Sequence, residues 1–233
     1  MSVAARVAWA REWVGDYTAN PHPDLGREGV VCPYMVKALR QDCITLIDFD
    51  CSEGDAALGA LARQMRGQMI ERAEGLGADA IYLVNLIVPY GNTETELKAM
   101  VGRVHSWLKE EFVAMGFMLG DFWPEHETIG LHSEIFRPFT SPLPILGMRH
   151  MVPADLVFFI TPDLTPHQQL NFMRHYRNVF AGRLNRYWSG RLEKHEAEAR
   201  VALETGQAVS EAVAREEVRE AARAALVEAA TAA

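Results

Sequence analysis

The sequence is poor in cysteine: among 233 residues it has only Cys32, Cys43 and Cys51. An odd number of cysteines, at spacings unlike those of zinc ribbons, predicts reduced thiols and neither a disulfide framework nor a structural zinc site. No run of about 18 apolar residues is present, which argues against a membrane span. Residues 1–15 contain Arg6 and Arg11 within their apolar stretch and do not resemble a secretory signal. We therefore expect a soluble, cytoplasmic protein that does not bind membranes.

Positive charge is also scarce, because 23 Lys and Arg residues stand against 31 Asp and Glu residues, for a formal net charge of −8. Binding of nucleic acid requires clustered Lys and Arg side chains, so this acidic balance argues against a nucleic-acid partner. The chain lacks the glycine-rich dinucleotide motif, the P-loop and the nucleophile elbow of hydrolases. The expected partner is a small-molecule substrate, and a homo-oligomer is left open.

Hydrophobic periodicity predicts helices alternating with strands. Amphipathic spacing or a capping box predicts four helices, which cover residues 3–14, residues 52–74, the stretch after Thr93 and the stretch after Thr165. Apolar, β-branched composition predicts three strands, at residues 43–50, 81–88 and 156–161. The order favours an α+β (mixed α/β) fold with a central mixed sheet flanked by helices.

The domain organisation follows from two changes in composition. Prolines interrupt residues 116–151, which we expect to be irregular and functional, since long loops in compact domains usually carry function. Beyond Trp188 the chain is rich in Ala, Glu and Arg. We therefore predict one catalytic-type domain over residues 1–188 and a C-terminal helical extension over residues 189–233.

The first functional candidates lie in residues 21–34. Turn-forming residues fix the path of this segment and leave His22 and Arg27 available to a ligand; Arg27 is suited to bind a carboxylate or a haem propionate. The alternative is a tight loop whose Asp24 caps backbone amides. Cys32 followed by Pro33 is suited to an axial haem ligand, and its alternative is a small buried apolar side chain.

The second candidates lie between residues 123 and 150. His126, His132 and Glu134 could form a non-haem iron site, although their spacing matches no compact metal motif and His126, between two glutamates, is predicted to be solvated. Arg149 and His150 are embedded in apolar residues, where a charged pair is costly without partners. His150 could bind iron and Arg149 a carboxylate; the alternative is an Arg–carboxylate pair beneath the core.

Several of these segments together resemble the YqcI/YcgG-type bacterial proteins over roughly residues 20–185. The resemblance rests on Cys32-Pro33-Tyr34, Phe122-Trp123-Pro124, Phe136-Arg137-Pro138-Phe139, the stretch from Pro142 through Arg149-His150, and Leu156-Val157-Phe158-Phe159. That group includes haem proteins that N-hydroxylate guanidines and one that releases hydroxyurea from hydroxyarginine. Ser141-Pro142 stands where members carry His-Pro, so a ligand from that position is absent here.

The resemblance implies a haem-dependent oxygenase-like enzyme that acts on an amine, guanidine or hydroxylamine group in specialised metabolism. Haem b would be the cofactor, with Cys32 or His150 as axial ligand and His132 as a weaker metal candidate. His22, Arg27 and Pro33 would help to hold the cofactor, and Arg149 and Glu134 would be catalytic. The alternatives are a non-catalytic binding protein that oligomerises through its tail, and a non-haem iron enzyme.

These expectations share one geometric condition. The Cys32 loop must meet Arg149 and His150 at a cleft large enough for a cofactor.

Overall fold

The computed structural model describes residues 1–206 and Glu220. Its contacts divide the chain into two compact units, Met1–Lys109 with Phe117–His150, and Glu110–Gly116 with the described residues from Met151 onward. The predicted boundary at residue 188 falls inside the second unit. Apart from Glu220, the part of the predicted tail beyond residue 206 lies outside the described residues, as does any role for it in oligomerisation.

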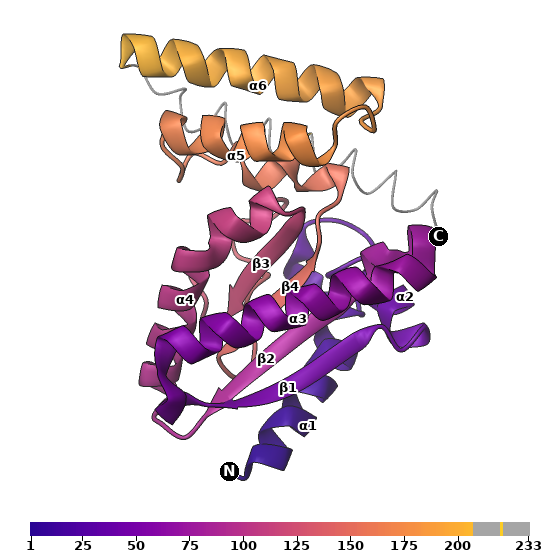
Figure 1. Cartoon of the computed structure of the whole chain (residues 1–233), viewed down its shortest axis with the longest axis vertical. Coiled ribbons are helices and arrows are strands. Elements are labelled where there is room, and N and C mark those ends of the chain that lie inside the picture. Colours follow the sequence, from indigo (N-terminus) through magenta and orange to yellow (C-terminus); the bar gives the residue numbers. More distant parts are fainter. Residues whose placement is uncertain (207–219, 221–233) are drawn as a thin grey trace. The chain divides into compact units, whose positions relative to one another are not determined.

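A four-stranded mixed sheet forms the centre of the first unit (Figure 1). Its strands are β1 (Ile44–Asp50), β2 (Val84–Tyr90), β3 (Phe117–Phe122) and β4 (Ile145–His150), in the order β1-β2-β4-β3. β1 and β2 are parallel, whereas β4 runs antiparallel to both β2 and β3. The predicted α+β fold with a mixed sheet is confirmed.

Two long helices cover one face of this sheet. A parallel strand pair needs a crossover, and α3 (Gly54–Leu76) followed by the 3₁₀ turn Gly77–Tyr82 supplies it between β1 and β2. The Asn85 side chain of β2 donates a hydrogen bond to the Met65 carbonyl of α3 at 3.2 Å. α4 (Glu94–Ala114) joins α3 on this face, because its His105 contacts Asp121 of β3, which the strand register places on the same side as Asn85.

The amino-terminal segment covers the opposite face. It comprises α1 (Val3–Trp13), a π-helical turn (Val14–Thr18), a 3₁₀ turn (Pro23–Leu25) and α2 (Met35–Arg40). The Trp13 ring meets the Phe122 ring edge-on, with 5.5 Å between centroids. Phe122 and Asp121 are neighbours in β3 and point to opposite faces, so α1 and α4 lie on opposite sides of the sheet; Figure 1 shows α1 behind the strands and α3 in front.

The second unit is helical. It contains the 3₁₀ turn Pro153–Phe158, α5 (Pro166–Val179) and α6 (Arg186–Thr205). Its core includes stacked Phe159 and Phe172 and the fully buried Trp188. Arg177 of α5 forms a 2.8 Å ion pair with Glu196 of α6. The predicted C-terminal helix is thus present over the residues that are described.

Three predicted segments differ from the structure. The apolar run 156–161 is predicted as a strand, but its first three residues lie in a 3₁₀ turn, because Asp155 accepts a hydrogen bond from the Val152 amide at 2.8 Å and Pro153 starts the helical path. Short apolar runs do not distinguish strands from buried turns by periodicity. β3 and β4 lie in the stretch expected to be irregular, and β2 begins three residues later than predicted.

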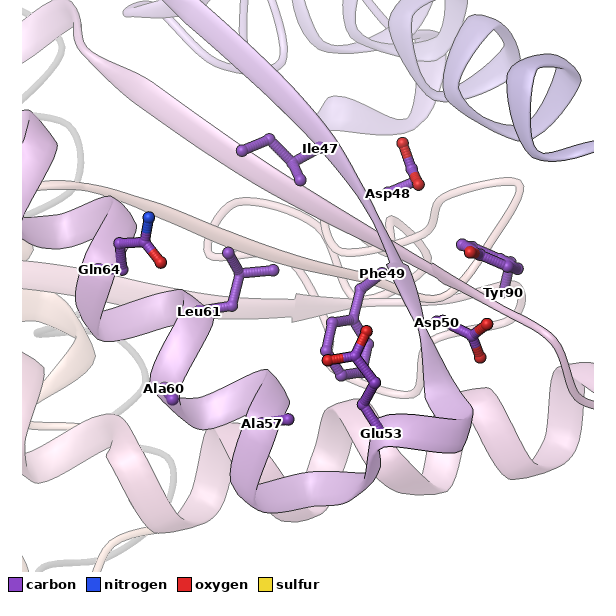
Figure 2. Close-up of a pocket in the computed structure, with 10 residues that line it drawn as sticks. All are labelled: Ile47, Asp48, Phe49, Asp50, Glu53, Ala57, Ala60, Leu61, Gln64 and Tyr90. Carbon is purple, nitrogen blue, oxygen red and sulfur yellow. The ribbon is translucent and has the colours of Figure 1, made fainter.

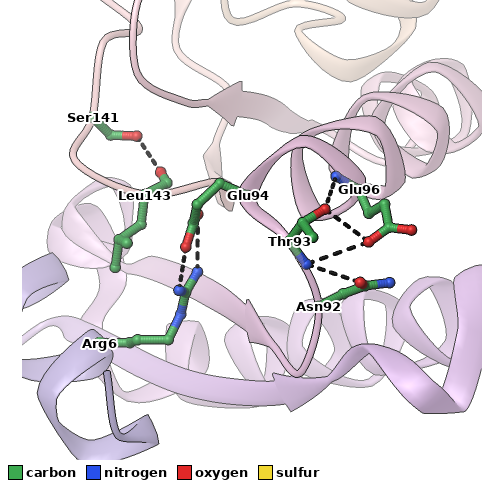
Figure 3. Close-up of polar contacts among 7 residues, drawn as sticks. All are labelled: Arg6, Asn92, Thr93, Glu94, Glu96, Ser141 and Leu143. Carbon is green, nitrogen blue, oxygen red and sulfur yellow. Dashed lines mark hydrogen bonds and ion pairs between the residues drawn. The ribbon is translucent and has the colours of Figure 1, made fainter.

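An ion pair connects α1 to the start of α4 (Figure 3). The Arg6 guanidinium lies 2.5 Å and 3.3 Å from the two carboxylate oxygens of Glu94. Glu94 follows Thr93, whose hydroxyl and amide exchange capping contacts with Glu96, so the predicted capping box is present. Only 8% of the Arg6 side chain is exposed, against 52% of Glu94.

We predict that Glu94→Ala lowers the free energy of unfolding by about 1–2 kcal/mol, since it leaves a buried guanidinium without its carboxylate while Glu94 itself is partly screened by solvent. Urea denaturation measures this change. Arg103→Ala is the control, because the Arg103–Asp55 pair is exposed and should contribute less than about 1 kcal/mol. Equal losses in the two variants would contradict the prediction.

Candidate functional site

The two segments predicted to be functional pack against each other. The Tyr17 hydroxyl donates to the Arg137 carbonyl at 3.1 Å, and the His22 and Phe136 rings lie 5.0 Å apart. Gly26 has φ +75°, and a Cβ atom placed on it would lie 2.1 Å from the His132 carbonyl oxygen. The amino-terminal loop and the 126–137 region therefore form one continuous surface of the first unit.

Residues 123–140 form a loop whose two ends meet. The Trp123 amide donates to the Phe139 carbonyl at 3.4 Å, and the Ser141 amide donates to the Trp123 carbonyl at 3.3 Å. The Trp13 indole donates to the Thr140 carbonyl at 3.1 Å and ties this neck to α1. Compact loops with adjacent ends are often functional. We refer to residues 123–140 as the Ω-loop.

Cys32 lies in a hydrogen-bonded turn at the start of α2. Its amide donates to the Thr18 carbonyl at 2.8 Å, and its carbonyl accepts from the Met35 amide at 3.2 Å. Arg27 donates to the carbonyls of Glu28 and Val31 at 2.9 and 3.1 Å. Burial lowers the pKa of the Arg27 guanidinium, and interaction with Cys32 partly opposes that shift. Cys32 is a half-buried free thiol beside a guanidinium.

Arg149 and His150 face opposite sides of the sheet. The Arg149 guanidinium lies 5.5 Å from the centre of the Tyr34 ring, so Arg149 faces the Cys32 turn. The His150 ring lies 4.5 Å from the Phe117 ring, where burial lowers its pKa, and its buried Nε2 has no hydrogen-bond partner among the described residues. Successive side chains in a strand alternate between faces. The structure brings Arg149, and not His150, to the Cys32 turn.

The sequence interpretation missed a cluster formed by His105, Asp121 and His126. His105 Nδ1 lies 3.3 Å from one Asp121 oxygen, and His126 Nε2 lies 4.0 Å from the other. His105 Nε2 also lies 3.1 Å from the Leu119 carbonyl, so both contacts of this ring are hydrogen bonds only when both nitrogens carry protons. Burial raises the pKa of Asp121, but the hydrogen bond from His105 and the charges of both histidines outweigh it and leave the pKa lowered.

His126 is buried, contrary to the solvated position predicted for it. Its side chain is 7% exposed and stacks on Trp123 with 4.2 Å between ring centroids. The adjacent Trp123 is the sequence signal that could have indicated burial, since an aromatic neighbour offers the imidazole a surface to cover. The carboxylates that flank His126 in sequence turn outward, and Glu127 pairs with Lys98 of α4 at 3.0 Å.

The remaining metal candidates are less enclosed. Glu134 is exposed, and its carbonyl accepts from Arg137 at 2.7 Å, while His132 is half-buried. Across the described part of the chain, no three His, Cys, Asp or Glu side chains are grouped so as to hold a metal ion. His126 Nδ1 accepts from the Thr128 amide at 3.2 Å, so the neutral ring carries its proton on Nε2.

A depression of about 450 Å³ lies at the carboxyl end of β1 (Figure 2). Its wall combines an apolar surface from β1 and α3 with polar groups from β1, β2, α3 and the turn after β1. The lining residues are Ile47, Asp48, Phe49, Asp50, Glu53, Ala57, Ala60, Leu61, Gln64 and Tyr90. The Ser52 amide donates to Asp50 at 2.9 Å and lowers the pKa of that carboxyl. Ligands of α/β sheets commonly bind beyond the carboxyl ends of parallel strands.

The fold and these surfaces define an α+β protein with a mixed sheet and a helical second unit. A family model described as a domain of unknown function, DUF6875, matches residues 7–189, and the chain belongs to that family. Searches of curated proteins and of solved structures found no match. None of the described helices has both the length and the apolar character needed to cross a membrane.

We predict that Gly26→Ala destabilises the protein by about 2 kcal/mol or more, because it combines an unfavourable positive φ with a clash against the His132 backbone. Urea denaturation measures the loss, and chymotrypsin cleavage after Phe136, which is buried when the loop is closed, reports release of the Ω-loop. Gly29→Ala is the matched control: Gly29 has φ +89°, but its added Cβ would meet only Arg27, at 3.5 Å. If both variants lose the same stability, the close approach at Gly26 contributes nothing.

Proposed function

We propose that this protein is a haem-dependent enzyme that oxidises a nitrogen group of a small metabolite, with Cys32 as the iron ligand. The observation that most directly supports this proposal is the contact between Tyr34 and Arg149, since it brings the Cys32 turn to the end of β4. The resemblance to YqcI/YcgG-type proteins, together with the packing of the amino-terminal loop on the Ω-loop, supports this choice.

The residues at this turn fit a haem in their chemistry. Cys32 offers a half-buried thiol with no disulfide partner, and Pro33 restricts the backbone that carries it. Arg149 would hold a propionate or a substrate carboxylate, and Tyr34 would orient that guanidinium through its ring. Arg27 is bonded to carbonyls of its own loop, so its role would be to hold the Cys32 turn in shape. Bound haem supplies activation of O₂ or of an N–O bond.

His150 is the competing ligand. Its buried Nε2 lacks a hydrogen-bond partner among the described residues, and its lowered pKa favours the neutral imidazole that binds iron. It faces the side of the sheet opposite to the Cys32 turn, however, so the two residues would place haem on different faces. Mutagenesis can therefore separate them.

We expect protein produced with iron and a haem precursor to show a Soret band, and its reduced carbonyl complex to have the red-shifted band of thiolate ligation. Cys32→Ser should lose the thiolate signature. Cys51→Ser, a half-buried thiol at the far end of β1, should keep it. If His150→Gln loses haem while Cys32→Ser retains its spectrum, His150 is the ligand. A colourless protein that takes up no added hemin would contradict the cofactor itself.

A second candidate function is the binding of a small organic cation without catalysis. The depression at the carboxyl end of β1 favours it, because its volume is in the range of ligand pockets and its lining includes the carboxylates of Asp48, Asp50 and Glu53 as well as apolar side chains of β1 and α3. Carboxylates bind ammonium and guanidinium groups through charge-assisted hydrogen bonds. A compact amine with a short apolar body matches this lining.

We predict that agmatine, which carries both an amine and a guanidinium group, binds the haem-free protein and that Glu53→Gln weakens this binding by about threefold to tenfold, as expected for one charge-assisted contact at an exposed rim. Isothermal titration calorimetry at low and high salt measures it. Glu12→Gln, an exposed carboxylate of α1, is the control. No binding by the unmodified protein, or equal loss in both variants, would eliminate this candidate.

A further inference from the structure

The Ω-loop has a histidine in its neck that neither proposed function uses. His126 lies between Trp123, on which it stacks, and Phe139, whose ring centroid is 5.5 Å away. Trp123 and Phe139 are also the two ends of the loop joined by a backbone hydrogen bond. The imidazole therefore fills the space where the loop closes on itself, and the closure depends on how well this ring fits there.

The hydrogen bond that His126 accepts from the Thr128 amide requires the neutral ring. Nδ1 accepts a hydrogen bond from the Thr128 amide, and a proton placed on Nδ1 would oppose that donor. Nε2 is fully buried, and its nearest described carboxylate oxygen, on Asp121, lies 4.0 Å away, beyond hydrogen-bond distance. Protonation would thus break the turn at Thr128 without completing a short ion pair.

Charged groups from three elements face this ring. Asp121 of β3 and Glu127 of the loop itself favour the protonated ring, whereas Lys98 and His105 of α4 oppose it. Burial opposes protonation most strongly, and it leaves the pKa of His126 below the ordinary value of 6.5. When the loop opens, water restores that ordinary value. The open loop therefore binds a proton more readily than the closed loop does.

We propose that His126 is a pH-sensitive latch: its neutral form holds the Ω-loop closed on β3, and its protonation at mildly acidic pH releases the loop. Release would uncover the surface that the loop shares with the amino-terminal segment at Tyr17, His22 and Gly26. Because the folded pKa is lowered, the closed state is fully favoured above pH 6.5 and loses stability as the pH falls below that value. The latch does not depend on haem binding.

Hydrogen–deuterium exchange of the full chain at about pH 7.5 and about pH 5.5, corrected for intrinsic exchange, tests this proposal. We expect exchange in residues 123–140 to accelerate at the lower pH by up to about tenfold, because pH 5.5 lies about one unit below the ordinary imidazole pKa of 6.5. Peptides from α3 should not change. His126→Gln, which cannot titrate, should exchange equally at both values.

Two further variants identify the titrating group. His132→Gln removes a half-buried histidine of the same loop and should keep the pH response. His105→Gln should keep it as well, with a shifted midpoint, because His105 faces His126 through Asp121. If the response disappears in either variant and persists in His126→Gln, or if the wild-type loop exchanges equally at both values, the latch is wrong. Should His126→Gln fail to fold, an NMR titration of the wild-type His126 ring decides: a pKa at or above 6.5 overturns the proposal.

Discussion

The two-residue repeat of the β-sheet determines which side chains of this protein can act together. In β3, Asp121 faces α4 while Phe122 faces α1. In β4, Arg149 faces the Cys32 turn while His150 packs on Phe117. A shift of one residue in register would exchange all four positions, and such a shift is strongly disfavoured in a sheet covered on both faces. Neighbours in sequence are therefore separated into two sites.

The Ω-loop depends on the same sheet for its position. β3 and β4 are adjacent antiparallel strands, so the segment that joins them begins and ends at the same end of the strand pair. The loop cannot lie flat against the amino-terminal segment unless that segment offers room, and Gly26 provides it by having no side chain opposite the His132 carbonyl. Buried Phe136 then occupies the space beside Tyr17 and His22. One glycine and one aromatic residue thus position two loops that are far apart in sequence.

Local signals in the sequence predicted the long elements well. The capping boxes at Thr93 and Thr165 mark the starts of α4 and α5, because the residues that satisfy a helix start lie within one turn. β3 and β4 were missed, since Gly120 and Gly147 dilute their strand composition. The need for a glycine here follows from a contact between strands that the local sequence does not show. A Cβ on Gly147 would lie 2.9 Å from the ring of Phe122, which belongs to the neighbouring strand β3.

The sequence indicated which segments contain candidate residues, but it did not predict which side chains lie next to one another. The predicted meeting of the Cys32 loop with Arg149 and His150 is found for Arg149 alone, because His150 lies on the other face of the sheet. The His105–Asp121–His126 cluster was missed because its members come from a helix, a strand and a loop. His105 interrupts an apolar helical stripe, which indicates burial but names no partner. Only the register of β3 against β4 places Asp121 between the two histidines.

The two candidate ligand sites lie at opposite ends of the same strands. Val84 at the start of β2 pairs with Arg149, beside the Cys32 turn, whereas Tyr90 at its end pairs with Asp50, in the acidic depression. Six residue steps along a strand span about 20 Å, which is longer than a small metabolite. A single small ligand therefore cannot contact both, and a cation held at Asp50 would not be the nitrogen group presented to a haem at Cys32. If both sites bind ligands, the acidic depression must bind a second molecule. A ligand in the depression could then affect the Arg149 site only through β2, the strand that connects the two sites.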